Sequence, residues 1–358
     1  MALFRLVLLV AGGALVALVL NIHGLQNSEW YSIVITTLLA IGLYASTYGI
    51  DLREARQHSK IIISAVTVGV IFKAAFTGLI LTILFRDPFF FILGIAVAQI
   101  DPLSVAGLMK GSRMSKKAKT ILSSWASFDD PVTVLLSLYA PLLVMQITGF
   151  HFGSIGASAA ATNSLAAYAR EIGFNFGLAV LVFCLYTTLR FYAKQITARA
   201  AAGVSIATYV LLAVSFSASI ACFAMLGIAL IGLFLRPVTL EKIIDKTVAW
   251  ALGIAALLLG LLLIDGASVW QGVMLGIMAY VSQTIVGLIL TRKLSKKDRW
   301  HIALAQQNGI TAIILALLFE QSHPGTVAIV APAIIVINTL HWMCNSIMDR
   351  YFIKTATN

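Results

Sequence analysis

Four ionisable side chains, Lys73, Asp101, Asp129 and Asp130, lie inside long apolar stretches of this 358-residue sequence. A charged group at the centre of a bilayer costs about 2.5–3.5 kcal/mol on insertion scales, so each of them requires a partner or a task. Two adjacent carboxylates in a dry site cannot both ionise freely, and such a site takes up a proton or a metal cation. The acid pair therefore predicts a site that exchanges one for the other.

Two prolines directly follow these acids, Pro102 after Asp101 and Pro131 after Asp130. Because proline has no N–H and clashes with the carbonyl four residues earlier, each one frees a carbonyl within its helix. A broken helix at membrane depth is tolerated only where it lines a cavity or packs against protein. Oxygen ligands suit a hard cation such as Na⁺, by analogy with calcium and magnesium. The expected ligands are the carboxylates of Asp130 and Asp101, the hydroxyls of Ser127 or Thr133, and the freed carbonyls.

The surrounding sequence indicates that these residues lie in a lipid bilayer. Hydrophobic residues make up 60% of the chain and charged residues only 11%, whereas a soluble domain carries roughly 25% charged residues. No stretch alternates apolar and polar residues over about 10 positions, as a membrane β-barrel would. With about 20 residues per crossing, the sequence predicts an all-α polytopic membrane protein with about twelve transmembrane helices. The expected spans are 2–20, 32–50, 61–85, 89–109, 119–147, 172–190, 203–218, 219–235, 247–264, 268–290, 300–320 and 325–348.

The net charge of +11 follows the loops between these spans. Cytoplasmic loops carry an excess of Lys and Arg. With a cytoplasmic N-terminus, every one of the 25 basic residues except Lys73, Arg86 and Arg170 falls in a cytoplasmic segment. The pattern predicts cytoplasmic N- and C-termini, with the inner membrane of a bacterium as the expected location, and it explains the charge without a nucleic-acid partner. No small-residue cleavage site precedes Asn21, which favours an uncleaved first helix over a signal peptide.

The histidines and cysteines show no metal-binding pattern. His301, His323 and His341 are scattered near span ends, where an interfacial position is expected, and Glu320 at the end of its span is expected to be interfacial and solvated. The three cysteines lie in apolar surroundings and are expected to be small core residues. No cofactor is therefore expected beyond the transported ions.

The segment 96–143 carries the strongest resemblance to a known family. It combines an Asp-Pro break, a Lys-rich loop and a helix with an acid pair. In these features the whole chain resembles the monovalent cation:proton antiporter superfamily, the sodium/proton exchangers and their relatives. The resemblance implies that Asp130 carries the ion and the proton, that Asp129 is its neighbour, and that Asp101 lies where two broken helices cross.

The resemblance also implies inverted-topology repeats, with the ion site at their interface. The second broken helix is then expected in span 300–320, where Asn308 lies in a polar segment ahead of an apolar run. The remaining helices are expected to form a scaffold and a homodimer interface. Within a single transmembrane domain, 1–358, the expected core is 61–147 and 268–348 and the expected scaffold is 1–50 and 172–264.

The sequence departs from the family's pattern in two ways. Relatives with an acid pair often carry a Lys in the tenth span, and by spacing that position is Gln283 here. Other relatives carry an ion pair, a Glu five residues before the ion-binding Asp and an Arg before the Gly of span 300–320, and those positions are Trp125 and Asn308 here.

Lys73 lies in the third span, which is the repeat-related counterpart of the tenth, and we expect it to pair with Asp129 or Asp101 in one state. Lys73 lies about 12 residues from either end of its span, which is a long distance for its side chain to extend to the water at the membrane surface.

The predicted function is secondary active transport without enzymatic activity: exchange of Na⁺, or another monovalent cation, for H⁺ by alternating access. The nearest alternatives are a K⁺/H⁺ antiporter and a Na⁺-coupled symporter of an organic anion. Symport requires a roomy cavity with anion-binding donors. An intramembrane aspartyl protease would need acids on two facing helices and a Gly-x-Gly-Asp motif, which Asp129 and Asp130 lack. A purely structural subunit would have no reason to keep three buried acids.

Overall fold

A computed structural model of the chain describes residues 2–50, 56–112, 114–148, 165–193, 198–264 and 266–357. In these ranges the regular structure is helical and contains no strand. Seven described helices are long and apolar enough to cross a membrane, and two shorter apolar helices accompany them. The predicted all-α polytopic fold is thereby confirmed. The helices of the first half are α1 (Ala2–Leu20), α2 (Glu29–Tyr48), α4 (Ser59–Ser64), α5 (Val70–Phe85), α6 (Phe89–Val97), α7 (Pro102–Gly111) and α8 (Lys116–Thr148).

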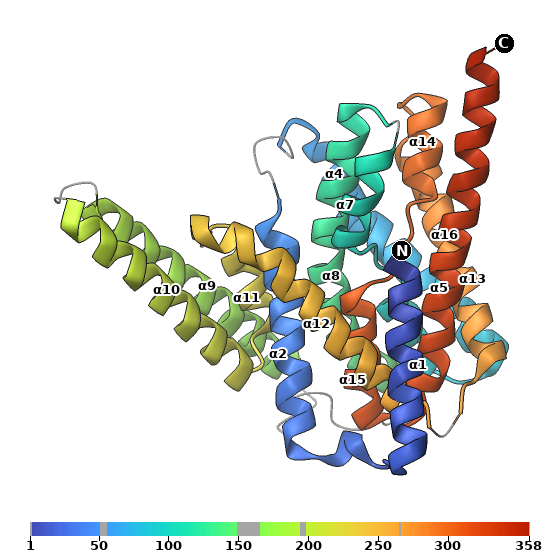
Figure 1. Ribbon diagram of the computed structural model, residues 1–358, viewed down its shortest axis with the longest axis horizontal. Helices are drawn as coiled ribbons and strands as arrows, with labels where there is room; N and C mark the ends of the chain where they lie inside the picture. The colour runs from blue at the N-terminus through green and yellow to red at the C-terminus, as the bar shows by residue number, and fades with distance from the viewer. Residues whose placement is uncertain are drawn as a thin grey trace.

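The second half begins with two long helices that extend to one side of the molecule (Figure 1). The apolar run 201–236 divides at 222–224, slightly later than the expected division near residue 218. The chain turns there because Phe223 adopts the left-handed conformation, with φ at 53°. The helices of this half are α9 (Leu165–Ala193), α10 (Ala198–Ala221), α11 (Met225–Gly232), α12 (Glu241–Leu261), α13 (Val269–Leu290), α14 (Lys296–Ala303), α15 (Ile310–Ser322) and α16 (Thr326–Thr357).

One pattern of helices occurs twice in the chain: a continuous helix, an interrupted helix and a second continuous helix. In the first set α4 runs through the π-helical turn η2 (Ala65–Gly69) into α5, the interrupted helix is α6 and α7, and α8 follows. In the second set α13 is followed by the interrupted α14 and α15 and then by α16. The two sets span 59–148 and 269–357, and Figure 1 shows them gathered on one side of the molecule.

Glycines bring the helices of the first set into close contact. Gly78 of α5 faces Gly94 of α6, and a Cβ atom at Gly94 would meet the backbone of Gly78 at 2.6 Å. Only glycine allows two helix backbones to approach this closely. This contact fixes α6, which leads into the first break, against the helix that carries Lys73.

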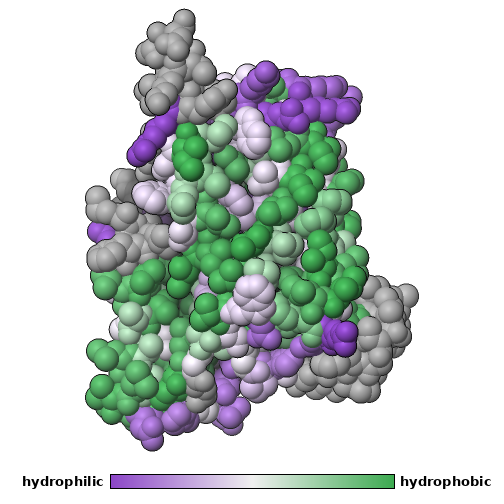
Figure 2. All heavy atoms as spheres, turned by 90° about the vertical axis from the view of Figure 1, so that its right-hand side faces the viewer, coloured by the Kyte–Doolittle hydropathy of each residue, from purple (hydrophilic) through white to green (hydrophobic). Residues whose placement is uncertain are grey.

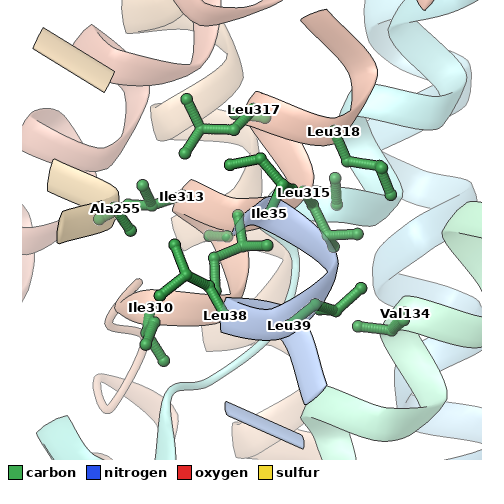
Figure 3. Packing of buried hydrophobic residues seen from close by; sticks show 14 of the residues in the cluster. Ile35, Leu38, Leu39, Val134, Ala255, Ile310, Ile313, Leu315, Leu317 and Leu318 are labelled. Atoms are coloured by element: carbon green, nitrogen blue, oxygen red, sulfur yellow. The ribbon is translucent and has the colours of Figure 1, made fainter. Parts of the chain in front are cut away.

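A large apolar cluster fills the space between α2, α8, α12 and α15 (Figure 3). Every residue of α15 from Ile310 to Glu320 is buried. Figure 3 shows Leu39 of α2 beside Val134 of α8, close to Leu315 of α15. The cluster therefore packs the second interrupted helix tightly on one side of the break.

The outer surface is suited to lipid. Figure 2 shows hydrophobic residues over a broad band of one face, with hydrophilic residues gathered above and below it. Large apolar side chains such as Ile83 and Trp342 are exposed. Cys184 on α9 and Cys222 in the turn after α10 are also exposed, which corrects the expectation that they are core residues.

A polar contact joins the two sets at the basic start of α8. Asp298 of α14 accepts hydrogen bonds from the Ser115 N–H at 2.9 Å and from its hydroxyl at 2.7 Å. Ser115 in turn accepts from the Ala118 N–H at the start of α8. The contact therefore ties the first turn of α8 to the first turn of α14.

Asp298→Asn is expected to lower the free energy of unfolding near neutral pH. Burial raises the pKa of Asp298, but the hydrogen bonds from Ser115 outweigh it and hold the pKa below its usual range. A carboxyl group with a lowered folded-state pKa stabilises the protein above its unfolded pKa, about 3.9, and loses that contribution as pH falls through the folded pKa. The loss in the variant should be about 1.5–3 kcal/mol, typical of a hydrogen bond to a charged group.

Thermal unfolding in detergent at a series of pH values would measure this difference. The difference in unfolding temperature between wild type and Asp298→Asn should shrink once the pH falls below about 4. Asp245→Asn is the control because Asp245 is exposed. A gap that stays constant over the whole pH range would show that the charge of Asp298 does not stabilise the contact.

Candidate functional site

The breaks in the two interrupted helices contact each other. Residues 98–101 separate α6 from α7, and residues 304–309 separate α14 from α15. The Asp101 N–H donates to the Gln307 carbonyl at 2.9 Å, which joins the two breaks directly. The side chain of Gln306 donates to the carbonyls of Val97 and Gln99 at 3.0 and 2.8 Å. Polar residues of the second break thus bind carbonyls that the first break leaves without helical donors.

Two asparagines complete the crossing. The amide of Asn308 donates to the Val97 carbonyl at 3.1 Å. The Asn338 side chain of α16 accepts from the Asn308 N–H at 3.1 Å and donates to the Asn308 carbonyl at 3.0 Å. Asn338 therefore replaces the helical partners of Asn308. Sequence reasoning placed Asn308 at the second break and missed Asn338, although an Asn within an apolar span could have drawn attention to it.

Asp101 is the N-cap of α7 and faces the second break. One of its carboxylate oxygens, Oδ2, accepts from the Ser104 N–H at 2.7 Å, with Pro102 as the first helical residue. The other oxygen, Oδ1, is buried without a hydrogen-bond partner. Gly309 lies directly against this carboxylate, and a Cβ atom at that position would collide with it. The second break thus requires glycine where it passes Asp101.

Asp130 lies on α8 and is 1% exposed. Its Oδ2 atom accepts a hydrogen bond from the Thr311 hydroxyl of α15 at 2.9 Å, and its Oδ1 atom has no partner. The Thr133 hydroxyl, one turn further along α8, is also buried without a partner. Asp101 and Asp129 are the acids close enough to repel a charge on Asp130. Sequence reasoning missed Thr311, whose only signal is its position directly after the second break.

These oxygens fit a transported cation. The Oδ1 atoms of Asp130 and Asp101 and the Thr133 hydroxyl are buried acceptors without donors. Buried polar atoms are normally paired, so such a group indicates a site for a partner outside the protein. Oxygen donors of this kind suit a hard monovalent cation or a proton. Ser127 is buried on the preceding turn of α8. Among described residues no cluster of His, Cys, Asp and Glu suggests another metal.

Asp129 faces a different neighbour, as expected for adjacent residues about 100° apart on a helix. Its Oδ2 atom lies 2.7 Å from Lys73 Nζ, and both side chains are fully buried. The same oxygen accepts from the Ile100 N–H in the first break at 2.8 Å. Lys73 Nζ also lies 5.5 Å from the centre of the Trp125 ring, within range of a cation–π contact. The structure therefore places Lys73 beside Asp129, one of its two expected partners. Because the Lys73 side chain is fully buried, it does not extend to the membrane surface.

Gln283 is fully buried on α13. Neither atom of its amide group has a hydrogen-bond partner. Its neighbour Ser282 accepts from the Thr77 hydroxyl of α5 at 3.1 Å, so α13 lies against the helix of Lys73. Gln283 therefore makes no hydrogen bond to the three acids.

A cavity of about 600 Å³ leads to the crossing from one side. It is lined at depth by Asp101, Asn308 and Gly309, and further out by Ser112 and Asp349. Ser112 follows the last residue of α7, next to the loop that leads to α8. The cavity thus opens on the side of the molecule where the basic segment 116–119 begins α8.

Three side chains near the span ends differ from their expected interfacial positions. His301 and His341 are 1% and 4% exposed, because both lie between α14 and α16 where the second interrupted helix packs. The amide of Asn345 and the ring of His341 contact the Leu304 carbonyl at the second break. Glu320, expected to be solvated, accepts from the backbone N–H groups of Gly325 and Val327 and so caps the start of α16.

Comparison with known proteins agrees with this geometry. A family profile described as "Sodium/hydrogen exchanger, transmembrane" matches residues 3–343. None of the curated proteins matches the chain. Among solved structures, the sodium proton antiporter MjNhaP1 from Methanocaldococcus jannaschii is similar, with a TM-score of 0.61 and 14% sequence identity over 95% of each chain. At this identity the structural match shows a shared fold, and the profile match shows the family.

Proposed function

Because this chain belongs to the sodium/hydrogen exchanger family, we propose that it exchanges Na⁺ for H⁺ through Asp130, which binds one or the other. The observation that carries the proposal is that Asp130, bonded to Thr311 just after the second break, and Asp101 at the first break each have a buried oxygen without a partner, with the unpaired Thr133 hydroxyl one turn along α8. Thr311 holds one oxygen of Asp130 in place and leaves the other free for the transported ion. The family match supports antiport over symport with an organic anion.

Competition at one carboxylate is enough to couple the two ions. A buried carboxylate with neither proton nor cation is costly, because its charge has lost its water. Proton and Na⁺ each neutralise Asp130, and neither leaves room for the other. The site therefore crosses the membrane only when it is occupied, and cation and proton are exchanged without binding together.

The cavity supports an alternating-access mechanism. It reaches Asp101 from one side of the membrane, while the apolar cluster around Val134 and Leu39 closes the other side (Figure 3). In the proposed movement the core, 61–147 and 268–348, shifts against the scaffold, 1–50 and 172–264. The basic segments lie on the cavity side, so the positive-inside rule makes this conformation inward-facing, with both termini cytoplasmic. We assign the chain to a bacterial inner membrane on the same distribution of charge.

The scaffold is also the proposed homodimer surface. The long helices α9 and α10 extend away from the core in Figure 1 and expose many large apolar side chains. They take no part in the crossing of the broken helices. A second copy could cover them without restricting the core, and no cofactor is needed for the exchange.

Proton flux in proteoliposomes would test the function. Purified protein is reconstituted with a pH-sensitive dye inside, the interior is made acidic so that the proton gradient is directed outward, and Na⁺, Li⁺ or K⁺ salts are added outside in turn, with protein-free liposomes as the control. Dissipation of the gradient on addition of Na⁺ is the expected result. A response to K⁺ alone would identify a K⁺/H⁺ exchanger, whereas no response to any cation would contradict cation–proton exchange.

A further inference from the structure

Two buried hydroxyls lie unpaired on α8, the helix of Asp130; the hydroxyls of Thr82 on α5 and Ser219 on α10 are also unpaired, but they lie on other helices. The Thr36 and Ser215 hydroxyls donate to the carbonyl four residues earlier in their own helix, at 2.7 Å in both cases. Thr133 and Ser137, 1% and 0% exposed, have no hydrogen-bond partner. Since a buried hydroxyl without a partner is costly, their free oxygens require an explanation.

The two hydroxyls continue the line of the ion site along one face of α8. At about 100° and 1.5 Å per residue, Ser137 lies roughly 20° around the helix from Asp130 and about 10.5 Å further along its axis. Thr133 lies between them, about 60° away from Asp130. Asp130, Thr133 and Ser137 therefore form a ladder of oxygens on one side of the helix.

Ser137 also offers a second oxygen. Pro141 lies four residues later within α8 and has no N–H to donate to the Ser137 carbonyl. The same relation links Pro131 to the carbonyl of Ser127 next to Asp130. The hydroxyl and carbonyl of Ser137, together with the Thr133 hydroxyl one turn before, are a set of neutral oxygen ligands suited to a hard monovalent cation.

The ladder runs away from the cavity. The first turn of α8 lies on the cavity side, where Ser115 contacts Asp298, and the helix then passes Asp130 before it reaches Ser137. Neither Thr133 nor Ser137 lines the cavity. On this side of Asp130, Val134 lies one turn further along α8 and is buried in the apolar cluster seen in Figure 3.

We propose that Thr133 and Ser137 form an outer transit site for a partly dehydrated monovalent cation, between Asp130 and the side of the membrane opposite the cavity. The cation would pass from Asp130 to these oxygens when the core moves and the apolar cluster opens. The inference rests on the proposed exchange at Asp130, and it adds an outer position with uncharged ligands that shares the Thr133 hydroxyl with the site at Asp130. Uncharged ligands suit a transit site, because they let the cation leave more easily than a carboxylate would.

Cysteine accessibility tests the position of this site. In a full-length parent with Cys184, Cys222 and Cys344 replaced by Ala, Ser137→Cys is compared with Leu135→Cys, which lies about 160° away on the same helix. Both are treated with a membrane-impermeant thiosulfonate from each side of oriented vesicles. We expect labelling of Ser137→Cys only from the side opposite the cavity, slowed by Na⁺, and no labelling of Leu135→Cys. Labelling from the cavity side, labelling that Na⁺ does not affect, or no labelling would overturn the proposal.

A kinetic comparison distinguishes a role of Ser137 in cation transit from a purely structural role. Ser137→Ala should raise the KM for Na⁺ several-fold when Na⁺ is supplied on the side opposite the cavity and leave it unchanged on the cavity side. Ser215→Ala, which removes a hydroxyl already bonded within α10, should change neither value. A KM on the side opposite the cavity that equals that of wild type, or a KM raised by the same factor on both sides, would contradict the proposal. Absence of cation-dependent flux in the wild-type protein would refute the exchange function instead, and the labelling pattern would still decide whether the outer route exists.

Discussion

Asp130→Asn is expected to reduce Na⁺-dependent proton flux to the level of protein-free liposomes. An amide keeps the size of the carboxylate and can still accept from the Thr311 hydroxyl, so the crossing should remain intact. It carries no charge to bind a cation and has no titratable proton to release. The variant therefore removes both halves of the exchange and leaves the fold in place. Dye-based flux in proteoliposomes measures the effect.

Two comparisons make the result specific to the ion site. Thermal unfolding of Asp130→Asn in detergent should remain cooperative and should not occur at a lower temperature, since a buried carboxylate becomes a neutral group. Asp245→Asn alters an exposed acid and should transport like wild type. Full flux in Asp130→Asn would remove this residue from the mechanism and leave Asp101 as the candidate carrier.

The parts of the site that could be predicted are those where a charged or polar residue interrupts an apolar span. Asp101 and Asp130 are acids inside apolar spans, and each is followed by a proline that breaks the hydrogen bonding of its helix. The second break could be placed from Asn308 because polar residues and a glycine interrupt an apolar run. Each of these signals is local, so no knowledge of tertiary contacts was needed to read it.

The other parts depend on contacts between segments far apart in the sequence. Thr311 and Asn338 look like ordinary polar residues of membrane helices until the two breaks cross and bring them to Asp130 and Asn308. The buried positions of His301 and Glu320 were missed for the same reason. A residue near a span end is interfacial only if no neighbouring helix covers it, and the helix packing decides this.

Lys73→Gln is expected to destabilise the protein strongly, because it leaves Asp129 buried without its cation. The lysine and Asp129 are both fully buried and 2.7 Å apart. Breaking such a pair by removing one partner costs about 3–5 kcal/mol. The Ile100 N–H is then the remaining donor to the Asp129 oxygen that the lysine contacted. We expect a lower temperature of thermal unfolding and a smaller yield of folded protein.

The double variant Lys73→Gln/Asp129→Asn separates the charge from the rest of the contact. With both charges removed, the amides can bond to each other, and most of the lost stability should return, whereas independent effects would add. The rescued protein also tests whether Lys73 takes the role of the missing Lys at Gln283. If it does, exchange by the double variant should differ from wild type in its proton-to-cation ratio and its pH profile. A stable double variant with wild-type coupling and pH profile would show that Lys73 and Asp129 support the first break without taking part in transport.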